Sequence, residues 1–190
     1  MGNVPPTSFT LRNGVPCVVR SAVADDTPRL MTFVPETFAT TDMVLTQADE
    51  WKLTEAQERA FVQECLDTPG SLAIVAEVAT SMTSGHGFAG MLTMKQGHRR
   101  RSEHTTYLGM MVGEAWRGKG VGDALMQCAV AFGKATPVLR RITLEVAASN
   151  PAGLALYKKH GFVIEGTRKG QFQRVPGVFE DDYCMACDVS

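Results

Sequence analysis

The stretch Tyr107–Phe132, YLGMMVGEAWRGKGVGDALMQCAVAF, contains the features that decide the fold. An apolar segment ends at Gly113, and a turn with three further glycines runs directly into a helical pattern. In that pattern apolar side chains recur along one face, from Val121 to Phe132. The stretch therefore predicts a buried strand, a glycine-rich turn and a helix over residues 121–135 that packs on a sheet.

The glycine-rich turn is suited to binding an anion. Glycine lets the backbone approach a ligand and point successive N–H groups into one hollow. The first turn of the following helix adds unpaired N–H groups and the positive end of the helix dipole. Glycines alone would also serve a tight turn without a ligand, but two cations stand among them. The sequence therefore predicts a phosphate-binding turn made of Arg117, Gly118, Lys119, Gly120, Val121 and Gly122.

Two common nucleotide-binding motifs do not fit this turn. The pattern GxxxxGK[ST] of nucleoside-triphosphate-binding loops does not occur in the chain. The spacing Gly118-x-Gly120-x-Gly122 differs from the dinucleotide pattern GxGxxG. The acidic residue expected at the end of a second parallel strand is also missing, because Glu145 lies within its predicted strand. The ligand is therefore expected to carry phosphate without being a typical nucleoside triphosphate or dinucleotide.

Outside this stretch, hydrophobic periodicity predicts a mixed α/β sheet in one domain. Residues 1–16 are rich in Pro, Gly, Asn and Thr and are expected to form a loose lead-in, so residues 17–190 form the domain. Thr54 and Gln57 form a capping box, which predicts a helix that ends before Pro69. Antiparallel strands come first, and a β-α-β-α-β run follows. The predicted strands cover residues 17–21, 71–79, 86–94, 105–113, 141–147, 162–168 and 178–186, and further helices begin near residues 25 and 151.

Composition and charge describe a globular chain with no strong overall field. The 190 residues carry a formal charge of −1, so nothing draws the whole chain to nucleic acid or to an anionic membrane. No apolar run approaches the roughly 18 residues of a membrane span, and the first residues do not resemble a secretion signal. We therefore expect a cytoplasmic protein that acts on a small or locally recognised partner.

The five cysteines are odd in number and mostly isolated, which is typical of reduced thiols. Cys184 and Cys187 form one Cys-x-x-Cys pair, but no second Cys or His pair of similar spacing exists to complete a zinc site. The alternation around this pair predicts a strand instead. No metal site is therefore expected.

Two motifs together resemble the GCN5-related N-acetyltransferase (GNAT) superfamily. Arg117–Gly122, RGKGVG, is similar to the superfamily motif (Gln/Arg)-x-x-Gly-x-(Gly/Ala) between a strand and a helix. Leu144–Thr167, LEVAASNPAGLALYKKHGFVIEGT, resembles the second half of its core, with a strand, an Asn, a helix containing a Tyr and a Gly-Phe turn. The resemblance covers about Thr105 to Arg168 and implies a mixed, mostly antiparallel central sheet flanked by helices.

The resemblance implies direct transfer of an acetyl group from acetyl-coenzyme A to an amine. The cofactor pyrophosphate would lie on the glycine-rich turn, and the pantetheine arm would pair with the backbone of Met110, Met111 and Val112. An N–H near Val112 would also stabilise the oxyanion that develops on the thioester carbonyl. Tyr157 would protonate the departing thiolate. Asn150, followed by Pro151, is a good helix N-cap and would also contact the cofactor.

The deprotonation of the amine requires a base or a water relay, and three residues are candidates. Glu103 and His104 stand at the entry to the central strand, and Glu145 stands on the following strand. Other histidines, His86, His98 and His160, are expected to be solvated at turns or helix ends.

The acceptor is predicted only in outline. A basic loop around Arg99–Arg101 and an acidic cluster, Glu180–Asp182, favour a zwitterionic or cationic small molecule. The pattern from Arg99 to Gly122 also resembles the branch that acetylates amino acids and similar amines. A protein N-terminal acetyltransferase of the ribosomal-protein type and a non-catalytic acyl-coenzyme A sensor are the alternatives, and a homodimer is compatible with either role.

Overall fold

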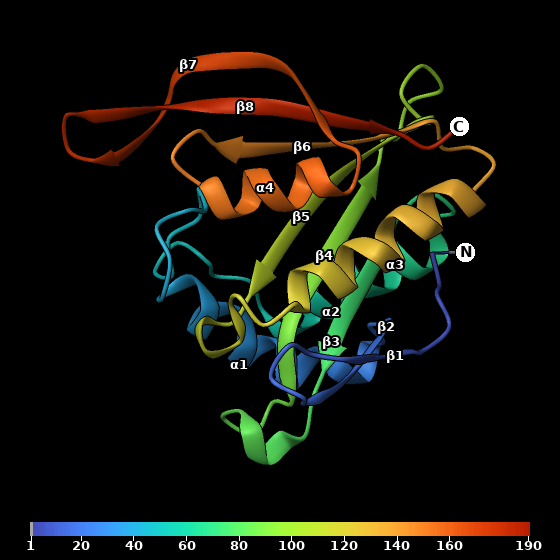
Figure 1. Cartoon of the computed structure of the whole chain (residues 1–190). Coiled ribbons are helices and arrows are strands. Elements are labelled where there is room, and N and C mark those ends of the chain that lie inside the picture. Colours follow the sequence, from blue (N-terminus) through green and yellow to red (C-terminus); the bar gives the residue numbers. More distant parts are fainter. Residues whose placement is uncertain (1) are drawn as a thin grey trace.

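A mixed sheet of eight strands runs through residues 2–190, the part of the chain that the computed structural model describes (Figure 1). The strands are β1 Thr7–Thr10, β2 Pro16–Ser21, β3 Leu72–Glu77, β4 Phe88–Gln96, β5 Thr105–Val112, β6 Arg141–Ala147, β7 Val163–Val175 and β8 Val178–Asp188. Their order in the sheet is β1-β2-β3-β4-β5-β6-β8-β7. Only the β5–β6 pair is parallel, which confirms the predicted mixed, mostly antiparallel sheet.

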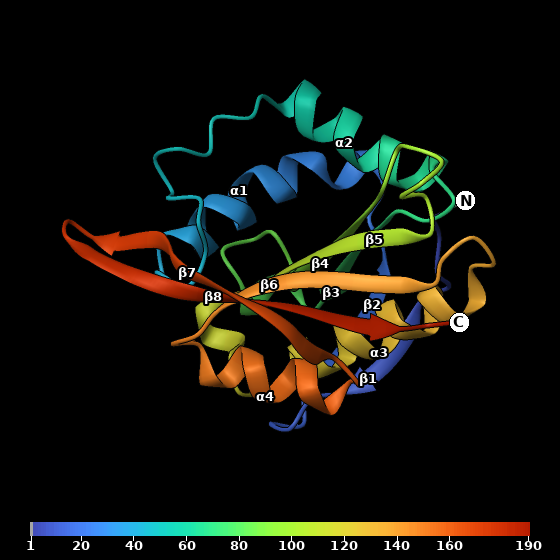
Figure 2. The same ribbon diagram turned by 90° about the horizontal axis from the view of Figure 1, so that it is seen from above.

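Helices cover both faces of the sheet (Figure 2). Those on one face are α1 Thr27–Phe38 and α2 Glu55–Asp67, and those on the other are α3 Val121–Ala135 and α4 Pro151–Lys159. Each face of the sheet packs on its helices through its own apolar cluster. The cluster on the face of α1 and α2 includes Phe33, Val75 and Met91. The cluster on the face of α3 and α4 includes Leu92, Leu125 and Ile142. None of these helices is long and apolar enough to span a bilayer, within residues 2–190.

The local signals of the sequence account for the main element boundaries. The capping box of α2 forms as predicted, because the Gln57 amide donates to Thr54 Oγ1 at 3.3 Å and the Thr54 amide donates to Gln57 Oε1 at 2.8 Å. Strands β3 and β4 form the predicted antiparallel hairpin, and α3 spans the predicted residues 121–135. The Cys184–Cys187 pair lies within β8, as the alternation indicates.

The segment expected to be a loose lead-in is part of the sheet. Strand β1 pairs with β2 from Thr7–Val19 to Thr10–Pro16, and the Gly2 amide donates to the Leu66 carbonyl at 3.0 Å. The segment is therefore ordered by backbone hydrogen bonds, which its Pro- and Gly-rich composition does not reveal.

The two strands of the parallel pair separate soon after they meet. Hydrogen-bonded pairing of β5 with β6 is limited to Thr105–Tyr107 against Arg141–Thr143. Strand β5 stays paired with β4 along its whole length, while β6 stays paired with β8. The sheet therefore divides into two halves that diverge between β5 and β6, as Figure 1 shows.

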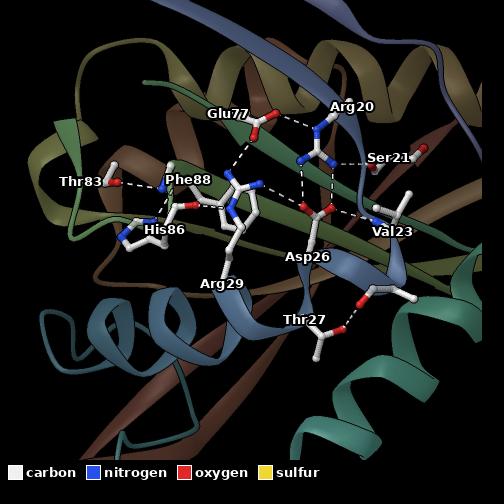
Figure 3. Close-up of polar contacts among 12 residues, drawn as sticks. Arg20, Ser21, Val23, Asp26, Thr27, Arg29, Glu77, Thr83, His86 and Phe88 are labelled. Atoms are coloured by element: carbon white, nitrogen blue, oxygen red, sulfur yellow. Dashed lines mark hydrogen bonds and ion pairs between the residues drawn. The ribbon is translucent and has the colours of Figure 1, made fainter. Parts of the chain in front are cut away.

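An ion cluster made of Arg20, Asp26, Arg29 and Glu77 holds the start of α1 against the sheet (Figure 3). Asp26 accepts two hydrogen bonds from the Arg20 guanidinium, at 2.7 and 2.8 Å. Glu77 on β3 accepts from both arginines, at 2.8 and 2.7 Å. Burial alone would raise the pKa of Asp26, but hydrogen bonds from Arg20 and from a backbone amide hold it below its ordinary value.

Arg29 links this cluster to the neighbouring strand. Its Nε donates to the His86 carbonyl at 2.6 Å, and its guanidinium lies 4.1 Å from the centre of the Phe88 ring (Figure 3). His86 is buried. Its Nδ1 accepts a hydrogen bond from the Phe88 amide at 2.9 Å, and its Nε2 lies 3.4 Å from Glu36. The expectation of a solvated His86 is therefore wrong, because both of its ring nitrogens have protein partners.

We expect Asp26→Asn to lower the free energy of unfolding at pH 7 by about 3 kcal/mol, because it leaves two partly buried guanidinium groups without the buried carboxylate that they share. The pKa of Asp26 is lower in the folded protein than in the unfolded chain. Its contribution is therefore present above the unfolded-state pKa, near 3.8, and is lost as the pH falls through the folded-state value. Urea unfolding from pH 7 to pH 3 should show the difference between wild type and variant shrinking in acid.

Asp25→Asn is the matched control, because the Asp25 side chain is 96% exposed and lies 3.4 Å from Arg59. This change should alter stability by less than about 0.5 kcal/mol. Equal losses for the two variants, or a constant difference across pH, would contradict the role assigned to the cluster.

Candidate active site

A cavity of about 860 Å³ passes through the sheet where β5 and β6 diverge. Its lining includes Gly122 and Tyr157 from the side of α3 and α4, and Thr37 and Phe38 from the side of α1. The cavity therefore connects the two faces of the sheet, which an unbroken ladder of strands would separate.

The glycine-rich turn forms one end of the cavity. Gly118 and Gly120 have φ angles of +72° and +96°, which L-residues with side chains rarely adopt. Helix α3 begins directly after Gly120 and has no side-chain cap. Five backbone N–H groups have no hydrogen-bond acceptor within residues 2–190. They are the N–H groups of Gly118, Gly120, Val121, Gly122 and Asp123. The predicted anion-binding geometry is therefore present at this turn.

A close approach of the two helices fixes the position of the turn. A Cβ atom at Gly122 would lie 2.9 Å from Leu156 Cδ2, so a larger residue here would force the Leu156 side chain on α4 to shift. Asp123, in the first turn of α3, lies 2.7 Å from both Lys159 Nζ and His160 Nε2. Burial alone would raise the pKa of Asp123, but these hydrogen bonds hold it below its usual value. His160 is therefore a hydrogen-bond partner of Asp123 and is not solvated as expected.

Cations at the turn are arranged differently from the sequence-based expectation. The Arg117 guanidinium donates to the Val112 carbonyl at 3.2 Å and to the Thr40 carbonyl at 2.9 Å, so it braces the turn. Lys119 Nζ lies 5.5 Å from the centre of the Trp116 ring. The charge that sequence analysis missed is Arg12, whose amide donates to the Lys119 carbonyl at 2.9 Å.

The Arg12 side chain lines the cavity beside Gly120. It is exposed, and its one hydrogen bond within residues 2–190 runs from Nη1 to the Gly118 carbonyl at 3.4 Å. This cation comes from the hairpin of β1 and β2, more than a hundred residues away in the sequence. No local motif could have identified it.

The middle of the cavity is bordered by the free edge of β5. Beyond Tyr107 this strand has no hydrogen-bonded partner on the β6 side, so the backbone of Met110, Met111 and Val112 faces the cavity. Edge amides and carbonyls of this kind can pair with an extended ligand, as they would with another strand.

Tyr157 lies across this gap on α4. Its ring packs against Phe162 at 6.0 Å between centroids, and its side chain is 8% exposed. Its hydroxyl has no hydrogen-bond partner within residues 2–190. Burial, with a smaller effect from Tyr107, raises the pKa of Tyr157 to about 12, so the phenol stays protonated near neutral pH.

Both ends of α4 are fixed by local signals that the sequence predicts. Asn150 caps the helix, because its Oδ1 accepts from the Gly153 amide at 2.9 Å, and it also lines the cavity. Gly161 follows the helix with φ +86°. These two ends set the angle at which Tyr157 enters the gap.

The other end of the cavity, on the side of α1, is acidic. Tyr107, Glu145 and Asp182 come from β5, β6 and β8 and share one face of the sheet. Glu145 pairs with Arg168 at 2.7 Å. Burial raises the pKa of Asp182, and the charge of Glu145 raises it further.

Two of the three candidate bases lie elsewhere. Glu103 and His104 precede β5 at the opposite end of the strand and do not line the cavity. Their main-chain carbonyls accept hydrogen bonds from Gln96 and Arg140, which makes this segment a sheet corner. The basic loop Arg99–Arg101 is exposed and also lies outside the cavity lining.

Comparisons with known proteins agree with this arrangement. The sequence model of the acetyltransferase (GNAT) family matches residues 38–162, more than half of the chain. An L-amino acid N-acetyltransferase of Escherichia coli K12, AaaT, is 32% identical over 129 residues, which cover 68% of this chain and 75% of that protein.

Two solved structures extend the similarity over the whole fold. A GNAT-family acetyltransferase from Streptococcus pneumoniae superimposes with a TM-score of 0.84 at 26% identity, covering 92% of this chain and 99% of the other. A phosphinothricin acetyltransferase from Sinorhizobium meliloti, solved with acetyl-CoA, gives 0.72 at 20% identity, covering 95% and 89%.

Proposed function

The chain belongs to the acetyltransferase (GNAT) family, and from that premise we propose that it acetylates the primary amino group of a small molecule such as an L-amino acid. It is an acetyl-CoA-dependent N-acetyltransferase, with acetyl-CoA as the acetyl donor. The acceptor class rests on the similarity to the Escherichia coli enzyme and on the acidic end of the cavity. The observation that carries the proposal is the cavity that joins an anion-binding turn to that acidic end, with Tyr157 between them.

We assign the binding of the donor to the glycine-rich turn and the free edge of β5. The amides of Gly118 to Gly122, together with Lys119 and the newly found Arg12, are suited to diphosphate because they combine N–H donors with positive charge. Arg117 holds the turn in shape. The backbone of Met110–Val112 would align the extended pantetheine arm, and Asn150 would contact it at the start of α4.

Acetyl-CoA supplies a thioester whose carbonyl carbon an amine can attack. In that transfer a C–N bond forms, the C–S bond breaks, and the leaving sulfur needs a proton. Tyr157 is proposed as the donor, because its protonated hydroxyl faces the cavity without another partner. Because burial raises the pKa of this phenol to about 12, it stays protonated near neutral pH and holds a proton that it can give to the departing thiolate.

The ammonium of the acceptor must lose a proton before it attacks. Glu145 is the proposed base, either directly or through water, since it is the one predicted candidate that lines the cavity. The Arg168 guanidinium lies 2.7 Å from this carboxylate and orients it.

The acceptor class is tested with a panel of amines. Purified protein is mixed with acetyl-CoA and each of the twenty L-amino acids, n-butylamine or short peptides with a free N-terminus, and free thiol is followed over time. We expect amine-dependent thiol release with at least one amino acid. Release with peptides alone would indicate a protein N-terminal acetyltransferase, and donor binding without release in any mixture would indicate a sensor.

Gly120→Glu should weaken acetyl-CoA binding by about 10-fold or more, since the new carboxylate repels phosphate and lies near Arg12, whose Cγ is 3.6 Å from the Cβ position. Gly177→Glu is the control, because Gly177 has a similar φ of +82° with nothing near its Cβ position. Isothermal titration calorimetry with acetyl-CoA measures both. An unchanged affinity in Gly120→Glu would show that the phosphates bind elsewhere.

Tyr157→Phe should lower kcat by about 100-fold while the dissociation constant of acetyl-CoA changes less than about twofold, because a proton donor acts in the transition state. The thermal midpoint should stay close to that of wild type, since the ring packing is kept and the hydroxyl has no partner within residues 2–190. Steady-state kinetics and calorimetry measure these values. Equal losses in kcat and donor affinity would contradict the assignment.

A further inference from the structure

Asp182 is a buried carboxylate without a side-chain hydrogen-bond partner within residues 2–190, and a backbone hydrogen bond from Tyr183 and the charge of Arg168 only partly offset its burial. Its side chain lines the cavity, the residue is 4% exposed, and no side chain within residues 2–190 donates a hydrogen bond to it. It lies opposite Ala147 on β6 and opposite Arg168 on β7. Buried carboxylates in proteins are normally paired, so this one requires an explanation.

The neighbouring cations are already engaged by other carboxylates. Strand β7 carries three cations, and each is paired in the structure, as Arg168 with Glu145 at 2.7 Å, Lys169 with Asp181 at 2.6 Å and Arg174 with Glu180 at 2.7 Å. The Arg168–Glu145 pair is neutral as a unit. The negative charge of Asp182 is therefore the one left over at this end of the cavity.

Burial and the charge of Glu145 both act against an ionised Asp182, and they raise its pKa. The protein thus keeps an acidic group where folding gains nothing from it. Such a local loss of folding stability is common where a bound ligand supplies the missing partner.

We propose that Asp182 is the anchor for the ammonium group of the acceptor, an inference that rests on the proposed acetylation of a small primary amine. The ammonium supplies the missing positive charge, and its three N–H donors fit a carboxylate beside Tyr107 and Glu145. In this position the acceptor nitrogen lies on the α1 side of the gap, opposite the glycine-rich turn. Asp182 therefore selects acceptors that arrive as a primary ammonium, and the neighbouring Glu145, paired with Arg168, is the proposed acceptor of the proton.

The test uses n-butylammonium as a probe that carries an ammonium and no carboxylate. Its binding to the coenzyme A-loaded protein is measured by ligand-observed NMR for wild type, Asp182→Asn and Asp181→Asn. Asp181 is the matched control, since it carries the same charge one residue away but pairs with Lys169 on the surface. We expect Asp182→Asn to weaken binding of the probe by about 10-fold or more, and Asp181→Asn to leave it within about twofold.

Two further readouts separate binding from a structural role. The affinity for acetyl-CoA should be unchanged in Asp182→Asn, and its thermal midpoint should be equal to or higher than that of wild type, because an unpaired buried charge is removed. For any L-amino acid that wild type acetylates, KM should rise more than kcat falls.

Different outcomes count against the role of Asp182 and against the proposed acceptor class. Unchanged probe binding in Asp182→Asn, equal weakening in both variants, or a lower thermal midpoint would overturn the role of Asp182. If Asp182→Asn weakens probe binding as expected but wild type acetylates no small amine, the ammonium site is upheld and the proposed acceptor class is overturned.

Discussion

The separation of β5 from β6 is the constraint on which the rest of the structure depends. Three residue pairs hold the two strands together, and beyond them each strand follows its other neighbour. A continuous sheet would keep the helices of its two faces apart. Because this sheet opens, a cavity of about 860 Å³ reaches from the start of α3 to the side of α1. The free edge of β5 and Tyr157 both line it.

The two ends of the cavity carry opposite charges. Unpaired amides and Arg12 make the glycine-rich end positive, whereas Asp182 makes the other end negative. The proposed sites follow these charges, with the phosphate-rich donor at one mouth and the ammonium of the acceptor at the other. The ion cluster around Asp26 is remote from both mouths, and it secures α1, which forms part of the wall at Thr37 and Phe38.

Local sequence signals were sufficient for most of the fold, including the glycine-rich turn and the start of α4. Glycine spacing, the Thr54 capping box and the Asn150-Pro151 pair act within a few residues, so the turn and both ends of α4 could be predicted. The contributions of Arg12 and Asp182 depend on strand pairing across long sequence distances, which periodicity cannot reveal. Composition also misjudged the segment before β2, because backbone pairing places Thr7–Thr10 in the sheet whatever their side chains.

The most direct test of the account is a crystal structure of the protein with acetyl-CoA bound. We expect the diphosphate to lie on the amides of Gly118–Gly122, the pantetheine arm to lie along β5, and the sulfur to lie within hydrogen-bond reach of the Tyr157 hydroxyl in the gap between β5 and β6. A cofactor that leaves this gap empty, or that enters with its sulfur far from Tyr157, would contradict it.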